Sequence, residues 1–455
     1  MLTKSRIKDE FDVKPITSGQ MEKWVTECVN IYQGNPPWLD QDDNIDTVNF
    51  AKSVCSEAAR LTTLGIGIHV DGSARADWLQ KQLERIYYRL REWVEYGCAY
   101  GTVILKPNGS TVELYAPGDF AVTHHTDGKI NGVVFTDSVE VGDKWYTKLE
   151  YHRFLDSGLY AIDNHCFVGG SKNSMDERID IALTPWAGMQ EEVTISYQYP
   201  LFAVFRTPQA NNIDMDSPSG LPLFSEAVQE LRDLDISYSR IAKEIDDSKR
   251  TVLLDSDALL SSGGKVSKTA TGFGHARRNL GLPDYIRNVS GDGTEIFYKE
   301  INPTLNTEER LKGLNALLNQ IGYKCGFSNG HFVFNERSGI QTATQVEADQ
   351  QRTIQLTKDI RDKLENCITD LCHALDAFAD LYGYAPRGAY ELTFDFGDIT
   401  YSYEEDKANW KHYATLGWIP KWLYLVKFEG LTEEEAKALV KEAEPKTPAL
   451  FGGDE

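Results

Sequence analysis

The sequence predicts an α+β protein built from several substructures with more than one hydrophobic core. Three observations predict it. Helical patterns precede a block of short β runs in the first half, two amphipathic helical patterns flank a compact insertion, and one unusually long helical pattern follows. At 455 residues the chain also exceeds the roughly 250 to 300 residues that one core usually supports.

The composition is that of an ordered globular protein. Hydrophobic residues make up 41% and charged residues 25%, with a surplus of aromatic residues. The opening stretch MLTKSRIKDEFD carries charges where a signal peptide needs an apolar core, and no run of 18 apolar residues occurs. We therefore expect an intracellular protein with no membrane partner.

The net charge is strongly acidic, at −22 from 47 Lys and Arg against 69 Asp and Glu. Such a surface repels polyanions on average, which argues against an ordinary DNA-binding module. It does not argue against a protein past which DNA must slide, because strong contacts to the DNA backbone would act as a brake.

The sequence contains no recognisable catalytic or metal-binding motif. The seven cysteines form no C-x-x-C pair, and G-x-S-x-G, H-E-x-x-H and G-x-x-x-x-G-K-[ST] are all missing. We therefore predict no catalytic residues, no metal and no cofactor, with the cysteines present as reduced and mostly buried thiols.

The first half predicts three helices and then a β region. Helical patterns cover residues 21–33, 48–64 and 78–98. The stretch TVILKPNGSTVELYAP then predicts a hairpin at PNGS, and GVVFTDSV, KWYTKLEYHRFL and GLYAIDNHCFVGG predict further strands. We expect one α+β domain up to about residue 215.

A helix pair with an insertion follows. The turn cluster 211–220 leads into an amphipathic helix that ends at the strand RTVLLD. The second helix, with Leu311, Leu314 and Leu318 on its apolar stripe, ends at Gly322 or Gly326. Because each helix has an apolar face, the two can pack together with the insertion at their tip.

The insertion contains a glycine-rich loop, residues 261–279, without one acidic residue. Its four bases are Lys265, Lys268, Arg277 and Arg278. Two interpretations stay open, a solvated loop and a docking loop for an acidic partner.

The longest helical pattern runs from Thr344 to Tyr382, about 57 Å by the rise per residue. Thr344 and Glu347 fit a capping box at its start, and Gly383 ends it. The alternating strand YELTFDFGDITY and a helical tail follow, and Thr432 with Glu435 fits a second capping box in that tail.

The order of these elements resembles the portal proteins of tailed double-stranded DNA bacteriophages, in the long-tailed branch. The likeness covers nearly the whole chain. Three stretches carry it: DMDSPSGLPLFSEAVQELRDLDISYSRIAKEI, LNQIGYKCGFSNGHFVFNERSGIQTATQVEADQQRT and ATLGWIPKWLYLVKFEGLTEEEAKALV.

The resemblance implies a ring-forming portal fold with wing, stem, clip and crown regions, in which twelve copies surround a DNA channel. Its implied regions follow the element order. They are a wing (1–222), a stem helix (223–249), a clip (250–302), a second stem helix (303–325), a tunnel loop (326–343), a long wing helix with a returning strand (344–400) and a helical crown (401–455).

The resemblance also implies the partners and the candidate site residues. The clip, with Lys265, Lys268, Arg277 and Arg278, would contact the terminase large subunit and later the head-to-tail adaptor proteins. The tunnel loop would turn polar residues toward DNA in transit, although a plain surface connection is the alternative. These residues are Asn335, Glu336, Arg337 and Ser338.

A portal would also meet the major capsid and scaffolding proteins, and would reside in the virion after assembly in the host cytoplasm. Acidic channel walls would repel phosphates and keep the duplex centred, since screening acts over about 8 to 10 Å. Two rival functions stay open: a structural adaptor or scaffold without a DNA channel, and an enzyme with an unrecognised site.

Overall fold

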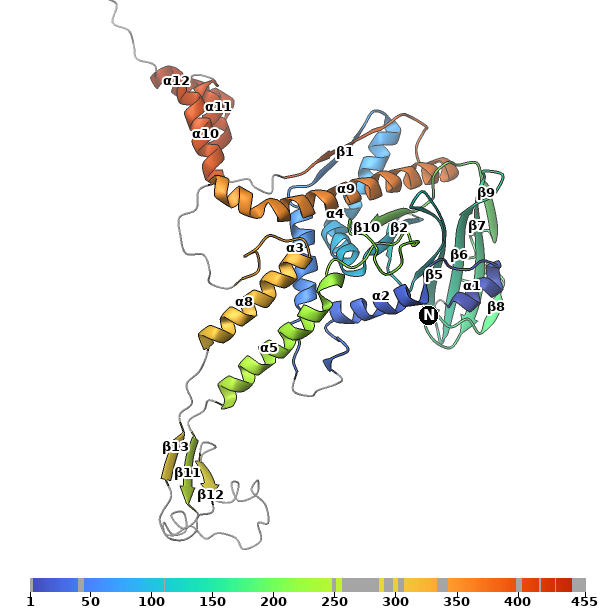
Figure 1. The fold of residues 1–455 in the computed structure, drawn as a ribbon. Coiled ribbons are helices and arrows are strands. Elements are labelled where there is room, and N and C mark those ends of the chain that lie inside the picture. The colour runs from blue at the N-terminus through green and yellow to red at the C-terminus, as the bar shows by residue number, and fades with distance from the viewer. Residues whose placement is uncertain are drawn as a thin grey trace, which may run out of the picture. The chain divides into compact units, whose positions relative to one another are not determined.

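The structure is a computed structural model that confirms a mixed α and β chain (Figure 1). Two compact units divide it, and each is described by itself: Met1–Thr63 with Gly67–Phe394, and Leu64–Ile66 with Asp395–Glu455. The structure describes residues 3–39, 45–109, 111–247, 251–255, 286–289, 298–301, 307–333, 343–397, 403–416, 419–429 and 431–443.

The first half of the chain forms the predicted helices and then the β region. Its helices are α1 Lys4–Phe11, α2 Gly19–Tyr32, α3 Phe50–Thr62 and α4 Ala74–Tyr100. Its strands are β1 Gly67–Asp71, β2 Thr102–Asn108, β3 Thr111–Tyr115, β4 Phe120–Thr126, β5 Lys129–Val141, β6 Lys144–Phe154, β7 Tyr160–Gly169, β8 Glu177–Ile179, β9 Glu192–Ile195 and β10 Ala203–Arg206.

The second half is mainly helical. Its helices are α5 Val228–Asp247, α8 Thr307–Lys324, α9 Ala343–Tyr382, α10 Tyr403–Leu416, α11 Lys421–Glu429 and α12 Glu433–Ala443. Its strands are β11 Thr251–Asp255, β12 Ile286–Val289, β13 Tyr298–Ile301 and β14 Glu391–Asp395.

The β region of the first unit contains two sheets. Strands β4 to β8 follow one another in an antiparallel sheet. Strand β8 pairs with residues 166–168 of β7, and β9 pairs with residues 160–163 of the same strand. A second sheet has the order β10-β2-β3, with the predicted hairpin between Asn108 and Thr111. Short turns join most neighbours in the larger sheet, which is the connectivity that alternating runs with tight turns predict.

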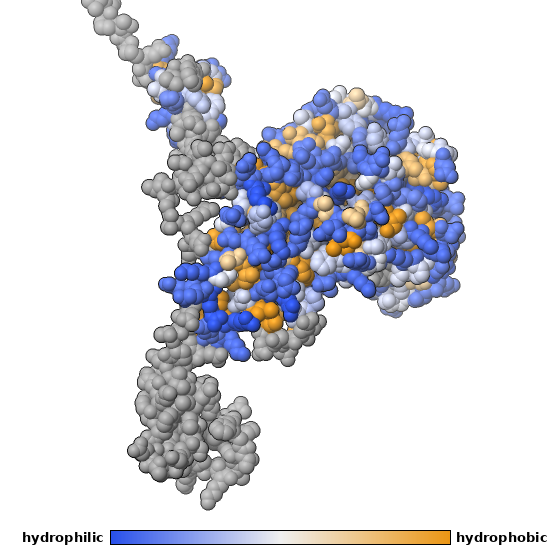
Figure 2. Space-filling model, viewed as in Figure 1, coloured by the Kyte–Doolittle hydropathy of each residue, from blue (hydrophilic) through white to orange (hydrophobic). Residues whose placement is uncertain are grey.

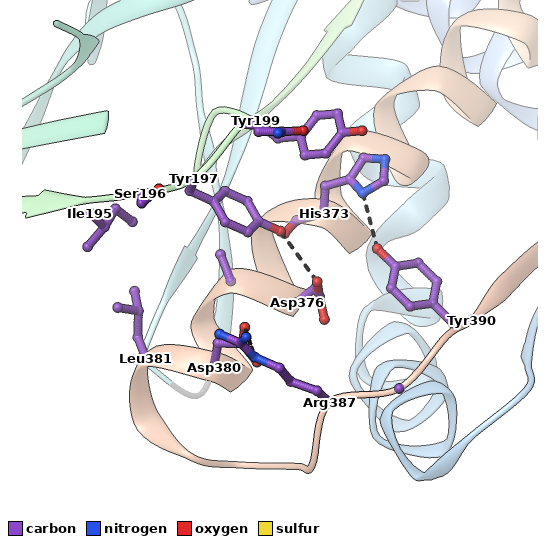
Figure 3. Close-up of a pocket in the computed structure, with 13 residues that line it drawn as sticks. Ile195, Ser196, Tyr197, Tyr199, His373, Asp376, Asp380, Leu381, Arg387 and Tyr390 are labelled. Carbon is purple, nitrogen blue, oxygen red and sulfur yellow. Dashed lines mark hydrogen bonds and ion pairs between the residues drawn. The ribbon is translucent and has the colours of Figure 1, made fainter. Parts of the chain in front are cut away.

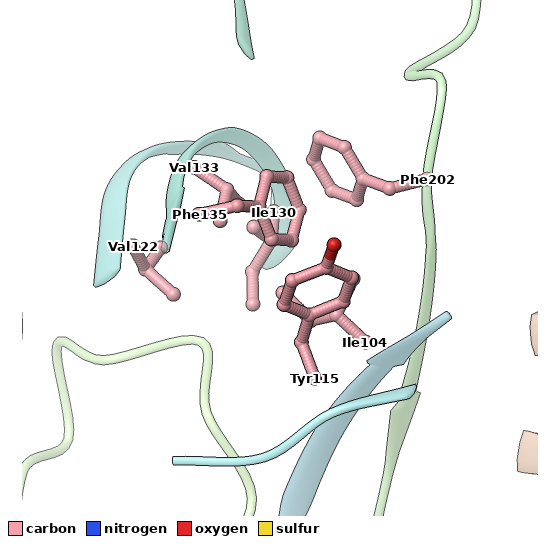
Figure 4. Close-up of a cluster of buried hydrophobic side chains, with 7 residues drawn as sticks. All are labelled: Ile104, Tyr115, Val122, Ile130, Val133, Phe135 and Phe202. Carbon is pink, nitrogen blue, oxygen red and sulfur yellow. The ribbon is translucent and has the colours of Figure 1, made fainter. Parts of the chain in front are cut away.

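A hydrophobic core joins the two sheets (Figure 4). Aromatic rings dominate it: the ring of Phe135 lies 4.8 Å from that of Tyr115 and 5.6 Å from that of Phe202, both at steep angles. Such edge-to-face pairs add to the stabilisation from burial alone. The buried members of this core are Ile104, Tyr115, Val122, Ile130, Val133, Phe135 and Phe202.

Helix α1 covers the other face of the larger sheet, and the sequence did not predict it. The hydroxyl of Thr3 caps the helix by accepting from the backbone N–H of Arg6. Its one buried residue, Ile7, packs among Val134, Leu149 and Phe167. An isolated helix of eight residues is marginal in water, so packing on the sheet beneath it supplies its stability.

Two lysines lie inside the β region rather than at its surface. The Nζ atoms of Lys106 and Lys148 lie 2.8 and 2.6 Å from the same carboxylate oxygen of Glu150. The other oxygen of Glu150 lies 2.6 Å from Nε2 of His152. Burial alone would raise the pKa of Glu150, but the two ammonium charges outweigh it and hold that pKa well below its usual range.

The predicted helix pair is present as α5 and α8, which pack side by side (Figure 1). Helix α5 begins at Val228 rather than 223, because Leu223 donates its backbone N–H to Cys98 and a 3₁₀ turn, Ser225–Ala227, intervenes. Between the two helices in sequence, β11 pairs with β12 and with β13 in a three-stranded sheet.

The long helix is confirmed as α9, which packs against α3, α4, β2 and β10. Gly383 ends it with a positive φ of 64°, and Tyr384 donates its N–H back to Ala379. The helix begins one residue before Thr344, within the usual uncertainty of helix ends. The side chains of Thr344 and Glu347 lie outside the described residues, so that capping box stays a prediction.

The second unit contains α10, α11 and α12. The predicted capping box is confirmed there. The backbone N–H of Thr432 donates to Glu435 at 3.0 Å, and the N–H of Glu435 donates to the Thr432 hydroxyl at 3.4 Å. The region boundaries that the resemblance implies stay predictions.

All seven cysteines are free and buried, as expected. Burial raises the pKa of Cys28, Cys98 and Cys372 to about 12, so these thiols stay protonated near neutral pH. Among the described residues no helix is long and apolar enough to cross a membrane.

Candidate functional site

The residues predicted to form sites fall outside the described part of the chain. Asn335, Glu336, Arg337 and Ser338 of the tunnel loop lie there, and so do Lys265, Lys268, Arg277 and Arg278 of the clip. Their contacts stay predictions. The structure does describe what flanks these residues: residues 326–333, which are the first part of the predicted tunnel loop, helix α9 after the loop, and the paired helices α5 and α8.

The turn at Gly326 sets the direction in which the chain leaves α8. Its φ is +90°, which favours glycine, and Phe327 donates its N–H back to Gly322 at 2.8 Å. Gly326 is therefore the stop, and Gly322 lies inside the helix. A Cβ at Gly326 would also come within 3.2 Å of Leu356 on α9.

A reciprocal pair of hydrogen bonds fastens the segment after this turn to α9. The N–H of Ser328 donates to the Thr353 hydroxyl at 2.9 Å, and the N–H of Thr353 donates to the Ser328 hydroxyl at 3.2 Å. Both residues are buried. Buried hydrogen bonds of this kind are costly to break, so the segment is fixed on α9.

His331 fastens the same segment to α3. Its Nε2 lies 3.0 Å from Glu57, which also receives two hydrogen bonds from the guanidinium of Arg60. These bonds, from Arg60 first and then from His331, lower the pKa of Glu57 to about 2. The rings of Phe327 and Phe332 lie beside His331, at 5.0 and 4.8 Å.

Two ion pairs connect α5 and α8 and show that they run antiparallel. Lys324 lies 2.6 Å from Glu230, and Arg310 pairs with Glu244. Residue numbers thus fall along α8 as they rise along α5. Near Glu230, buried Leu231, Leu234, Leu318 and Ile321 form the packed half of the pair.

The other half of the helix pair buries no side chain in the described ranges 240–245 and 308–313. Tyr238 at the start of this half is 47% exposed and Leu311 is 39% exposed. Figure 2 shows hydrophilic and hydrophobic residues mixed over these helices. An amphipathic helix whose apolar side chains remain exposed is typical of a surface that another chain covers.

Trp38, Asp46 and Val48 fasten α5 to the rest of the first unit. Asp235 accepts a hydrogen bond from the indole of Trp38 and another from the backbone N–H of Val48, both at 2.9 Å. Ser239 accepts from the N–H of Asp46 at 2.9 Å. The base of the helix pair is therefore a fixed part of the first unit.

A hollow of about 770 Å³ lies between residues 195–199 and the end of α9, and sequence analysis did not predict it (Figure 3). The ring of Tyr199 stacks on His373 with centroids 4.1 Å apart, and Nδ1 of His373 lies 3.1 Å from the hydroxyl of Tyr390. Tyr197 donates to the backbone carbonyl of His373 at 2.8 Å.

The charged groups of this hollow pair with one another. Asp376 and Asp380 accept from the buried guanidinium of Arg75, and Asp380 also pairs with Arg387 at 2.9 Å. Burial lowers the pKa of His373, so the ring is neutral near pH 7. The two acids of the hollow are thus matched by two arginines.

No group of three His, Cys, Asp or Glu side chains suited to a metal ion occurs among the described residues. No protein-family model matches the sequence, and comparison with curated proteins finds no significant match. The class of protein that the structure defines is a mixed α and β chain in which an antiparallel helix pair ends in a small β-sheet.

Proposed function

We propose that this chain is the subunit of a phage portal. In this proposal a ring of identical chains, twelve by the family resemblance, occupies one capsid vertex. Genomic double-stranded DNA is packaged and later ejected through the central channel. The protein is a structural channel and assembly platform, and it has no catalytic role.

The observation that carries the proposal is the helix pair. Antiparallel helices α5 and α8 are anchored to the first unit at one end, and the chain that connects them at the other end contains a three-stranded sheet. The exposed Tyr238 and Leu311 lie on the half that the chain leaves uncovered. This is the geometry expected for stem helices that pack against neighbouring copies, with a clip at their end.

The anchored segment after α8 supports the placement of the tunnel loop. Ser328 is bonded to α9 and His331 contacts Glu57 on α3, so the first part of the proposed tunnel loop is fixed on the first unit. Residues Asn335, Glu336, Arg337 and Ser338 would face DNA from there. A loop whose polar residues contact a moving DNA duplex must be attached to the protein at a point that does not move with the duplex.

The partners follow from the regions. The clip, with Lys265, Lys268, Arg277 and Arg278, would dock the terminase large subunit during packaging and head-to-tail adaptor proteins afterwards. The wing would meet the major capsid and scaffolding proteins. The net charge of −22 suits a channel that repels phosphates rather than binding them.

The mass and symmetry of the purified full-length protein test the proposal. Light scattering coupled to gel filtration is expected to give a closed oligomer. Negative-stain images are expected to show a ring with a central hole wide enough for a DNA duplex. Monomers or dimers at every protein concentration would instead favour the adaptor without a channel. Nucleotide turnover by the protein alone would favour an enzyme.

A further inference from the structure

The hollow between residues 195–199 and the end of α9 has the size and the lining of a ligand site (Figure 3). Its volume of about 770 Å³ lies within the range of about 300 to 1,000 Å³ that is common for binding pockets. Its rings belong to Tyr197, Tyr199, His373 and Tyr390, and its carboxylates to Asp376 and Asp380. Aromatic rings and carboxylates together are the groups that recognise organic cations.

The two arginines that pair with these carboxylates are held very differently. Arg75 has a fully buried side chain and donates to Asp376, to Asp380 and to three backbone carbonyls, so it is a permanent part of the fold. Arg387 has a side chain that is 86% exposed, and its one ion pair among the described residues joins Nε to Asp380 at 2.9 Å. An exposed ion pair adds little stability, so Arg387 can leave Asp380 at little cost.

Arg387 therefore marks a position for a guanidinium in the hollow. Arg75 holds one carboxylate oxygen of Asp380 at 2.6 Å, and within the described part of the chain Arg387 alone pairs with the other oxygen. Figure 3 shows the side chain of Arg387 extending toward Asp380. When Arg387 moves away, Asp376 and Asp380 share the single positive charge of Arg75, so one negative charge is unmatched. An incoming guanidinium restores the balance.

The rings offer a second contact to a flat cation. Tyr199 stacks one face on His373, with ring centroids 4.1 Å apart, and is still 44% exposed. Burial lowers the pKa of His373, so this ring does not repel a cation near pH 7. A guanidinium is planar and weakly hydrated, and it stacks on aromatic rings more readily than an ammonium does. An arginine side chain therefore suits the hollow better than a lysine side chain.

We propose that the hollow binds an arginine side chain of a partner protein, which replaces Arg387 on Asp380 and lies against the ring of Tyr199. The neighbours of this arginine in the partner are apolar, because the lining of the hollow includes Leu381, which is 48% exposed. All the lining residues belong to the first unit of one chain, so the proposal does not require the ring of the proposed function.

Two other ligands fit the hollow less well. A free organic cation would bring the charge but would leave the exposed apolar surface of Leu381 uncovered. A nucleic acid would bring phosphates toward Asp376 and Asp380, which repel them. A peptide segment with an arginine between apolar residues satisfies both the carboxylates and the apolar lining.

A labelled peptide tests the proposal on the purified full-length protein. The probe is a fluorescein-labelled pentapeptide, serine-leucine-arginine-leucine-serine with blocked ends, and fluorescence anisotropy in about 0.15 M salt measures its binding. A matched probe carries citrulline in place of arginine, which keeps the shape and removes the charge. We expect the arginine peptide to bind about tenfold more tightly, because it alone forms a charge-assisted pair with Asp380. Equal binding of the two peptides would overturn the proposal.

Three variants locate the bound peptide. Arg387→Ala vacates the proposed position and should tighten binding about threefold. Tyr199→Ala removes the stacking ring and should weaken binding about fivefold. Asp380→Asn removes the paired charge and should weaken binding about tenfold. If circular dichroism shows that Asp380→Asn does not fold, the first two variants still decide, because neither changes an acceptor of Arg75.

Lys144→Ala is the matched control for Arg387→Ala. Lys144 is exposed in the first unit and does not line the hollow, so its loss changes the net charge equally without touching the site. We expect the affinity of Lys144→Ala for the peptide to equal that of the unchanged protein. The proposal is wrong if Arg387→Ala does not tighten binding, or if Lys144→Ala tightens it as much.

Competition separates a docked peptide from a free cation. Argininamide carries the same guanidinium without apolar neighbours, so displacing the probe should take about tenfold more of it than of unlabelled peptide. If argininamide is equally effective, the ligand is a free cation and the docking proposal is wrong. Peptide binding by a chain that never forms rings would overturn the portal alone, whereas rings that do not bind the peptide would overturn the docking alone.

Discussion

The guanidinium of Arg75 donates to the carboxylate of Asp376 at 2.8 Å, across about 300 residues of sequence. Arg75 is 1% exposed and stands in the first turn of α4. Its other donors reach Asp380 at 2.6 Å and the backbone carbonyls of Asp376, Ala385 and Pro386. One side chain thus joins the start of α4, the last turns of α9 and the chain that leads to β14.

Removing this side chain should destabilise the first unit severely. Arg75→Ala removes the buried cation that two carboxylates and three carbonyls share, leaving Asp380 only its pair with exposed Arg387, and breaking a buried pair costs about 3 to 5 kcal/mol. Arg75→Lys keeps the charge but cannot reach five acceptors, so it should recover only part of this loss. Urea unfolding followed by circular dichroism measures both, with Lys81→Ala on the same helix as control. A loss under 1 kcal/mol for Arg75→Ala would contradict this role.

Glu57 should make the free energy of unfolding depend on pH in the acidic range. Its pKa is lowered to about 2 in the folded state, against about 4.3 when unfolded. The carboxylate therefore stabilises the fold fully above about pH 4.3, and this contribution is lost as the pH falls toward 2. After allowance for solvent screening, we expect it to amount to about 1 to 2 kcal/mol.

Glu57→Gln removes that dependence and should flatten the stability curve between pH 4.3 and 2. Chemical unfolding at a series of pH values measures it, and Glu140→Gln, at an exposed position, serves as the matched control. Curves of equal slope for the unchanged protein and Glu57→Gln would show that Glu57 is not the responsible group.

The buried lysines allow a double-mutant test. Glu150→Gln keeps the shape but leaves Lys106 and Lys148 to share Asp137, which lies 3.8 and 3.3 Å from them. We expect a loss of about 3 to 5 kcal/mol. Adding Lys106→Met removes one surplus charge, so the double variant should be more stable than Glu150→Gln alone. If the losses of unfolding free energy in the two single variants add up to the loss in the double variant, the two side chains do not interact.

The same residues show where sequence reasoning ends. The run KWYTKLEYHRFL correctly predicted β6, yet its alternation suggests that Lys148 and Glu150 lie on a solvated face. Period-two patterns identify which residues share a face but not what covers that face. The second lysine, Lys106, comes from β2 of the other sheet. No local sequence pattern predicts that Lys106 contacts Glu150.

The helical half was more predictable because its signals are local. The apolar stripe and Gly383 predicted α9 almost to the residue, and the Thr432 capping box formed as expected. Helix α1 was missed because tertiary packing of Ile7, not local propensity, supports it. The hollow beside Tyr199 and His373 joins segments far apart in sequence, so no local pattern signals it.

Two glycines inside helices should respond to alanine in opposite directions. Gly97 lies in α4, where an added Cβ would lie 2.2 Å from the ring of buried Phe205. Gly313 lies in α8, where no heavy atom comes within 4 Å of the added Cβ. Gly97→Ala should cost about 1 to 3 kcal/mol through overpacking. Gly313→Ala should gain about 0.5 to 1 kcal/mol by restricting the unfolded chain.

Urea midpoints at a protein concentration that keeps the chain monomeric measure both glycine variants. Gly97→Ala combined with Phe205→Leu tests the cause, because the smaller side chain leaves room for the methyl group and should recover part of the lost stability. If Gly97→Ala proves neutral, the close approach of α4 to β10 is looser than the structure shows. If Gly313→Ala proves destabilising, another part of the same chain must pack against this face of α8.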